Sequence, residues 1–195
     1  MTATVEPELV ARAAQRDAEA TSALLAQLRP GLIRYCRARL GRVGGAYTTA
    51  DDVAQEVCLA VLRALPRYRE QGRPFSAFVY AIAANKVADA QRAAVRASAA
   101  VATTSADLDR PDAAPGPEQQ AVTADLARRL SALLDRLPQA QRERVLLRVA
   151  VGLSADEVGA VMGMTATAVR VAQSRGLAQL RTLAGSGLEG EVSAA

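Results

Sequence analysis

The chain of 195 residues contains no histidine and no tryptophan. The missing histidine excludes Ser-His-Asp triads, a histidine general base and histidine-containing zinc sites. Only 3% of the residues are aromatic, and the hydrophobic residues are mainly alanine, leucine and valine. Alanine and leucine are strong helix formers, so the composition favours helices over sheets.

Long hydrophobic runs are absent as well. No segment approaches the roughly 20 apolar residues that a membrane-spanning helix needs. The N-terminus carries Glu6 and Glu8 and no basic segment followed by an apolar one, so no signal peptide is visible. We therefore expect a cytoplasmic protein.

Cysteine is scarce, and the two in the chain, Cys36 and Cys58, are not closely spaced. Both lie within helical patterns, which favours a role as small buried hydrophobic residues; a redox pair is the alternative. The net charge is +4 and the sequence pI about 9.6. This mildly basic balance is compatible with a nucleic-acid partner.

Composition divides the chain into four segments. Residues 98–118 are rich in proline, glycine and small or acidic residues, which predicts a flexible linker. The linker separates two helical domains, residues 1–97 and 119–184, and residues 185–195 are expected to be a disordered tail. The predicted fold class is all-α, with two small helical domains.

Helical spacing in the first domain is clearest from Thr49 to Leu65. Thr49 and Asp52 resemble a capping box, and Pro66 marks the end. One face carries small apolar residues at three- and four-residue steps: Val53, Val57, Ala60, Val61 and Ala64. The opposite face carries Asp52, Gln55, Glu56 and Leu59. That face is either solvated or docks a basic partner.

A second helix is predicted to begin near Pro74. Its core side consists of Phe75, Phe78, Val79, Ile82 and Ala83. Its later part carries a polar, net-positive stripe made of Asn85, Lys86, Asp89, Arg92 and Arg96. Such a stripe suits phosphates and base edges, although ordinary solvent-exposed surface is the simpler interpretation.

The second domain contains the most specific pattern. Ser154 and Glu157 form a capping box, Gly163 marks a short turn, and Thr165 caps a helix that is expected to reach about Leu183. Helix, short glycine-containing turn and helix is the helix-turn-helix plan. The second helix exposes Thr167, Arg170 and Ser174 on one side, and no acidic residue occurs between Val158 and Leu183. A structural helical hairpin is the alternative.

Taken in order, these segments resemble the extracytoplasmic-function sigma factors of bacterial RNA polymerase. ADDVAQEVCLAVLRALPRY resembles conserved region 2.2, PFSAFVYAIAANKVADAQR regions 2.3 and 2.4, and LDRLPQAQRERVLLRVAVGLSADEVGAVMGMTATAVRVAQSRGLAQLR region 4. The sequences of these segments are most similar to the actinobacterial sigma-D branch. Phe78 stands where many relatives have tryptophan, and Asn85 and Ser174 stand where that branch often has histidine.

The resemblance implies a role for each polar set. Asp52, Gln55, Glu56 and Leu59 would bind the polymerase core. Asn85, Lys86, Asp89 and Arg92 would read the −10 element. Thr167, Arg170, Val171, Ser174 and Arg175 would meet the −35 duplex, where arginine can pair with guanine and valine can pack against a thymine methyl.

The implied partners are the RNA polymerase core, through the β′ clamp helices and the β flap, and promoter DNA. An anti-sigma protein is left open as a further partner. No cofactor, metal or catalytic residue is implied. One alternative is a stand-alone helix-turn-helix regulator, which would leave the first two polar sets unexplained. The other is an enzyme, but the sequence has no histidine and no glycine-rich loop that could bind phosphate.

Overall fold

The computed structural model describes residues 5–40, 49–69, 72–100, 126 and 128–192. Apart from short connections these residues are helical, and they contain no strand, which confirms the all-α fold class. The elements are α1 (Pro7–Ala14), α2 (Ala18–Leu40), α3 (Ala50–Ala64), the 3₁₀ turn η1 (Leu65–Arg67), α4 (Phe75–Ala100), α6 (Gln139–Val145), the π-helical segment η2 (Leu146–Val151), α7 (Ala155–Met162) and α8 (Ala166–Val192). Residues 128–135 are also helical.

Helix α3 begins as its sequence predicts. The Asp52 amide donates to the Thr49 hydroxyl, and the Asp52 carboxylate accepts from the Thr49 amide at 2.9 Å, so the capping box is complete. Val53, Val57 and Val61 are buried. The polar face is therefore held away from the core.

Helix α4 begins directly after Pro74, as expected, and continues to Ala100. It therefore runs past residue 97, where we expected the first domain to end. Residues 101–118, the greater part of the predicted linker, lie outside the described residues.

The helix-turn-helix is present. Ser154 and Glu157 form a complete capping box on α7, and Gly163 ends that helix in the left-handed conformation with φ of 67°. A Cβ atom at Gly159 would lie 2.5 Å from the Met164 carbonyl oxygen, so the turn folds back closely over α7. The Thr165 hydroxyl accepts from the Ala168 amide at 3.2 Å and caps α8.

Helix α8 continues to Val192, through most of the segment expected to be a tail. No proline interrupts the sequence after Gly185. Extending an existing helix is far easier than nucleating one, so isolated glycines do not stop it.

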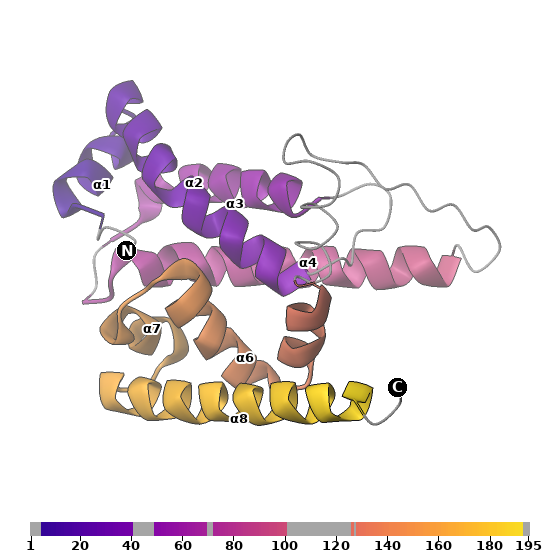
Figure 1. Ribbon diagram of the computed structural model, residues 1–195. Coiled ribbons are helices and arrows are strands. Elements are labelled where there is room, and N and C mark those ends of the chain that lie inside the picture. Colours follow the sequence, from indigo (N-terminus) through magenta and orange to yellow (C-terminus); the bar gives the residue numbers. More distant parts are fainter. Residues whose placement is uncertain (1–4, 41–48, 70–71, 101–125, 127, 193–195) are drawn as a thin grey trace, which may run out of the picture.

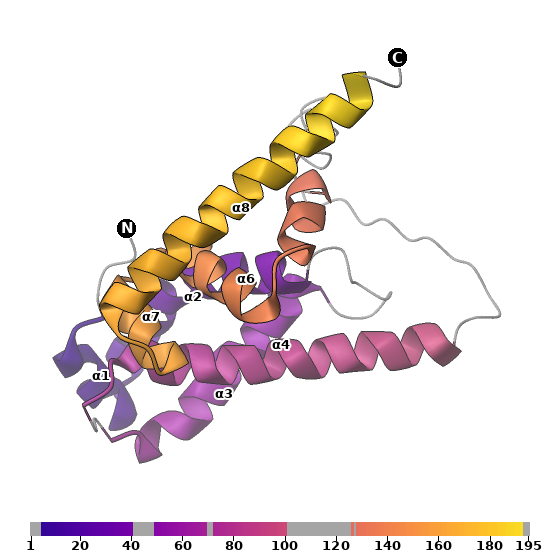
Figure 2. The ribbon, with the colours of Figure 1, turned by 90° about the horizontal axis from the view of Figure 1, so that it is seen from below.

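The helices form three layers (Figure 1). α1, α2 and α3 lie on one side of the long helix α4, and α6, α7 and α8 lie on the other. The view from below shows α8 crossing over the second-domain helices, with α4 behind them (Figure 2). α4 packs against both α3 and α7, and α2 packs against η2.

One hydrophobic core serves both domains. It joins Leu24, Tyr35 and Val79 of the first domain to Leu147 and Val158 of the second. Cys36 and Cys58 are free thiols buried in the first domain. The structure thus supports their interpretation as small hydrophobic core residues.

Candidate polymerase and promoter interfaces

The polar set on α3, which we call the α3 face, consists of Asp52, Gln55, Glu56 and Leu59, and all four are exposed. Leu59 is 46% exposed and places one large apolar side chain on this polar surface. Hydrogen bonds from Thr49 lower the pKa of Asp52, so its carboxylate is charged while it caps the helix. The face therefore combines negative charge, an amide and one exposed apolar contact.

Within the polar stripe on α4, the four residues expected to read the −10 element are Asn85, Lys86, Asp89 and Arg92, and we call these four the α4 stripe. Asn85, Asp89 and Arg92 are exposed, and Lys86 is half-buried. The Lys86 Nζ atom lies 3.4 Å from Glu56 Oε2, which places the α4 stripe directly beside the α3 face. Arg92 pairs with Asp89 at 2.5 Å. Asn85 is the uncharged residue among the four of the α4 stripe.

An arginine cleft, which the sequence reasoning missed, lies beside the start of α4. Its hollow of about 760 Å³ is bordered by four arginines, Arg63, Arg67, Arg69 and Arg73. Its walls include Tyr68 and Phe78, whose rings pack with centroids 4.9 Å apart. Arginines interleaved with aromatic residues suit a single nucleic-acid strand, because the cations meet phosphates and the rings can stack on bases. The segment RALPRYREQGRP contains this signal.

The set on α8, which we call the α8 set, consists of Thr167, Arg170, Val171, Ser174 and Arg175. All five are exposed. Val169 on the opposite side is fully buried, and Gly176 packs against Val145 and Gln141 of α6. The core thus fixes the rotation of α8 and turns the α8 set outward, as a recognition helix requires.

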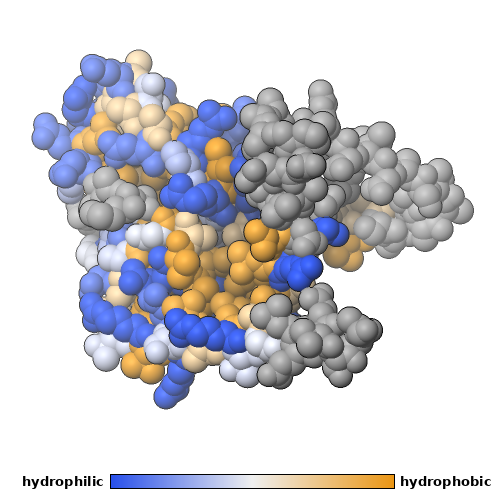
Figure 3. All heavy atoms as spheres, viewed as in Figure 1, coloured by the Kyte–Doolittle hydropathy of each residue, from blue (hydrophilic) through white to orange (hydrophobic). Residues whose placement is uncertain are grey.

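A second surface that the sequence reasoning missed is an apolar groove of about 790 Å³. Its walls come from residues 128–135, from α6 and η2, from α8 and from the end of α2. Leu130 and Val149 are 55% and 59% exposed there. Figure 3 shows hydrophobic residues gathered on this side of the molecule between α2 and α8. An apolar groove between helices is suited to a hydrophobic peptide segment.

Other kinds of site were also sought in the described part of the chain. It holds no cluster of three or more acidic or cysteine side chains able to bind a metal ion. Among the described helices, none is both long and apolar enough to cross a membrane.

Two family profiles match the chain. The family described as Sigma-70 region 2 matches residues 24–97, and the family described as Sigma-70, region 4 matches residues 127–180. The first match covers the α3 face, the α4 stripe and the four arginines of the arginine cleft. The second covers the helix-turn-helix and the α8 set.

Similar proteins match this chain over most of its length. The ECF RNA polymerase sigma factor ShbA of Streptomyces griseus is 53% identical over 183 residues, which cover 93% of this chain and 96% of ShbA. The ECF RNA polymerase sigma factor SigD of Mycobacterium tuberculosis is 54% identical over 173 residues, which cover 89% of this chain and 81% of SigD.

A solved structure shares the arrangement of the helices. It is the structure of CnrH in complex with the cytosolic domain of CnrY, with a TM-score of 0.65 and 26% identity, covering 92% of this chain and 96% of CnrH. CnrH of Cupriavidus metallidurans is an RNA polymerase sigma factor.

Proposed function

The chain belongs to the extracytoplasmic-function RNA polymerase sigma factors, and from this premise we propose how its surfaces divide the work of promoter-specific transcription initiation. A sigma factor binds core polymerase and directs it to promoters. The observation that carries the proposal is the outward position of three polar sets, on α3, α4 and α8, over one shared core.

The α3 face docks on the β′ clamp helices of the core enzyme. Its exposed carboxylates suit a basic partner, and Leu59 adds an apolar contact at the edge. Complementary charge of this kind fixes the orientation of a partner and speeds association. The apolar groove of the second domain receives the β flap, and a segment of the flap would cover Leu130 and Val149.

The α4 stripe reads the −10 element, and the arginine cleft beside it binds the separated strand. Unstacked bases can be held in a protein pocket and read by hydrogen bonds. Asn85 supplies a donor and an acceptor for base edges, while Arg63 and Arg67 of the cleft meet phosphates.

The α8 set reads the −35 duplex in the major groove. Arg170 can fork onto guanine, and Val171 can pack on a thymine methyl group. We assign the chain to the cytoplasm, where polymerase acts, and assign it no catalysis of its own. Because CnrH was solved with the cytosolic domain of CnrY, we expect an anti-sigma protein as the regulatory partner of this chain.

The docking assignment is tested by capture of core polymerase. The double variant Gln55→Ala, Glu56→Arg should lose core binding while keeping the fold, because both residues lie opposite the buried valines of α3. Reversing a charge against a basic partner typically costs several kcal/mol, on the order of 2–5 or more for a closely paired group.

Two controls make this test specific. Glu19→Arg reverses a charge of α2 whose side chain is 91% exposed, and core binding should be unchanged. Lys86→Ala removes the partner of Glu56 and should keep core binding while weakening −10 recognition. Capture of core by the double variant at the wild-type level would show that the α3 face is not the docking surface.

A further inference from the structure

A cavity beside α1 takes no part in the proposed docking of polymerase. It has a volume of about 330 Å³ and lies between α1, α2, the start of α4 and α7. We call it the α1 cavity, and its walls are mainly apolar, including Val10, Leu28, Phe75 and Leu153. Protein cores are close-packed and leave few such voids. Since an apolar cavity of roughly 150 Å³ already binds benzene, the α1 cavity has room for a small molecule.

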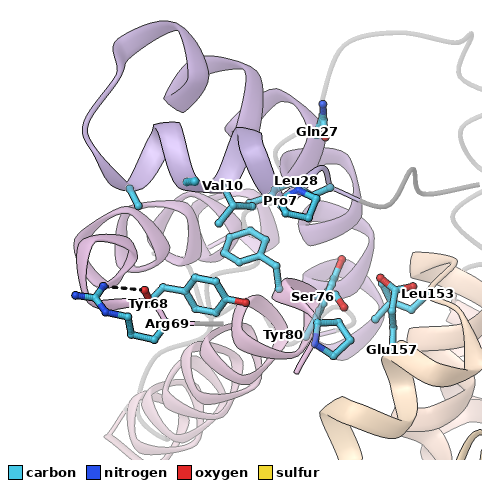
Figure 4. A pocket seen from close by; sticks show the side chains of 15 residues that line it. Pro7, Val10, Gln27, Leu28, Tyr68, Arg69, Ser76, Tyr80, Leu153 and Glu157 are labelled. Carbon is cyan, nitrogen blue, oxygen red and sulfur yellow. Dashed lines mark hydrogen bonds between the residues drawn. The ribbon is translucent and has the colours of Figure 1, made fainter. Parts of the chain in front are cut away.

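One end of the α1 cavity carries an arginine without an acidic partner. Arg69 is exposed, and Figure 4 shows it with Tyr68 at one side of the cavity. Its guanidinium donates to the main-chain carbonyls of Pro66 at 3.4 Å and Tyr68 at 3.1 Å, and no carboxylate of a described residue pairs with it. A guanidinium has five N–H donors in a planar fork, so Arg69 can also bind an anion such as a carboxylate.

The other end of the cavity presents a carboxylate and a buried hydroxyl. The Glu157 carboxylate accepts from the Ser154 amide at 2.8 Å, and Figure 4 shows Glu157 with Leu153 on the side away from Arg69. Tyr80 also lines the cavity; it is only 4% exposed, and its hydroxyl makes no hydrogen bond to a described residue. Burial raises the pKa of Tyr80, and the Glu157 carboxylate raises it too, so the hydroxyl stays protonated and can donate to a ligand oxygen.

These groups define a ligand by its charge and its size. An anionic head group is attracted by Arg69 and repelled by Glu157, so it binds at the Arg69 end. The rest of the molecule lies against apolar walls and must itself be apolar. A group the size of a water molecule occupies about 30 Å³ in a liquid, so the cavity holds roughly ten to eleven heavy atoms. A straight-chain carboxylate of about eight carbons has this size.

We propose that the α1 cavity binds a medium-chain carboxylate, with its head group on Arg69, its chain against the apolar walls and any oxygen at the far end of the chain on the Tyr80 hydroxyl. Arg69 also borders the arginine cleft. The bound head group would therefore neutralise one cation of the cleft and weaken its hold on the separated strand. This consequence rests on the proposed role of the cleft, whereas binding of the carboxylate does not.

Calorimetric titration of the full chain with straight-chain carboxylates at neutral pH measures the length of the site. Each methylene that enters the cavity tightens binding about fourfold. Octanoate should therefore bind about 15-fold more tightly than hexanoate. The gain should stop once the cavity is full, so dodecanoate should bind no more tightly than decanoate.

Substitutions at the two ends test the orientation of the ligand. Arg69→Gln should weaken octanoate binding about fivefold, the upper range for an exposed ion pair, and leave the binding of octanol unchanged. Arg67→Gln is the matched control, because Arg67 is exposed and borders the arginine cleft but not the α1 cavity. Tyr80→Phe should weaken the binding of 8-hydroxyoctanoate about fivefold through the lost hydrogen bond and leave that of octanoate unchanged.

Filling the cavity provides an independent test. Ala14→Met adds a flexible side chain to the cavity wall on α1, so octanoate binding should be lost. Ala26→Met, at an exposed position of α2 outside the cavity, is the control and should bind octanoate as the wild type does. Saturating octanoate should raise the melting temperature of the wild type and of Ala26→Met, but not that of Ala14→Met.

Two results would overturn the proposal. One is the absence of octanoate binding to the wild-type chain at about 1 mM. The other is equal octanoate binding by the wild type, Arg69→Gln and Ala14→Met, which would place the ligand elsewhere on the chain. None of these measurements uses polymerase or DNA. Failure of the proposed function would therefore appear separately, as full core capture by the Gln55→Ala, Glu56→Arg chain.

Discussion

The contrast between Arg170 and Arg181 provides a sharp test of how α8 reads DNA. Both are exposed on α8, and they are eleven positions apart. At 100° per residue, eleven residues make three turns plus about 20°, so the two side chains leave almost the same side of the helix. Their separation along the axis is about 16 Å at 1.5 Å per residue.

This separation exceeds the width of the groove. The major groove is about 12 Å wide, and a recognition helix places its N-terminal residues against the base edges. On the proposed docking of α8, Arg170, in the second turn after the Thr165 cap, should reach the bases. Arg181, about 16 Å further along the helix axis, should meet the phosphate backbone instead. A bidentate arginine–guanine pair contributes about 1–3 kcal/mol of discrimination, or about 5- to 150-fold between the right and the wrong base.

The assay is transcription by reconstituted holoenzyme from promoters that differ at single −35 positions. Arg170→Ala should flatten the preference at one position by about 5- to 150-fold. Arg181→Ala should lower every promoter by a similar factor, keep their ranking and reduce the salt dependence by about one counterion. If Arg181→Ala changes the ranking and Arg170→Ala does not, the orientation of α8 in the groove is wrong.

Three further predictions concern stability and reactivity. Hydrogen bonds from Thr49 lower the pKa of Asp52, so the contribution of this carboxylate to stability is complete above about pH 4 and is lost as the pH falls through its lower folded-state pKa. Asp52→Asn should therefore weaken the dependence of urea unfolding on acid pH. An unchanged dependence would contradict the cap. Burial raises the pKa of Cys36 to about 12 and also raises that of Cys58. A thiol reagent at pH 8 should therefore modify the native chain at least about tenfold more slowly than the urea-unfolded chain. Equal modification rates would mean that the core opens readily. Ser154→Ala should destabilise the second domain by about 1 kcal/mol through the lost cap in thermal unfolding, whereas Ser174→Ala, at an exposed position of α8, should leave the melting temperature unchanged.

Much of the fold could be predicted because local signals agree with the packing. Thr49 with Asp52, and Ser154 with Glu157, predicted two helix starts that the structure confirms. Val53, Val57 and Val61 predicted the buried side of α3, and thereby the outward side. These signals are short-range, since a cap or a helical face is decided within a few turns of chain.

Contacts between distant segments could not be predicted in this way. Tyr35 and Glu143 are 108 positions apart, and neither stands out within its own helix. The apolar groove likewise combines side chains from four separate segments, so no single stretch of sequence shows it. The arginine cleft is intermediate, because Arg63 to Arg73 lie within one short stretch of sequence, whereas Ala160 and Val161 of its wall come from the distant helix α7.

The most direct test of the central claim is transcription in vitro with purified core polymerase, this chain and a library of promoter fragments. We expect core alone to give no defined start sites, and core with this chain to start at fragments that share a −10 and a −35 sequence. The chain alone should bind the same fragments weakly at physiological salt. Tight, sequence-specific binding by the chain without polymerase, together with no factor-dependent transcript, would contradict the assignment as a sigma factor and indicate a stand-alone regulator.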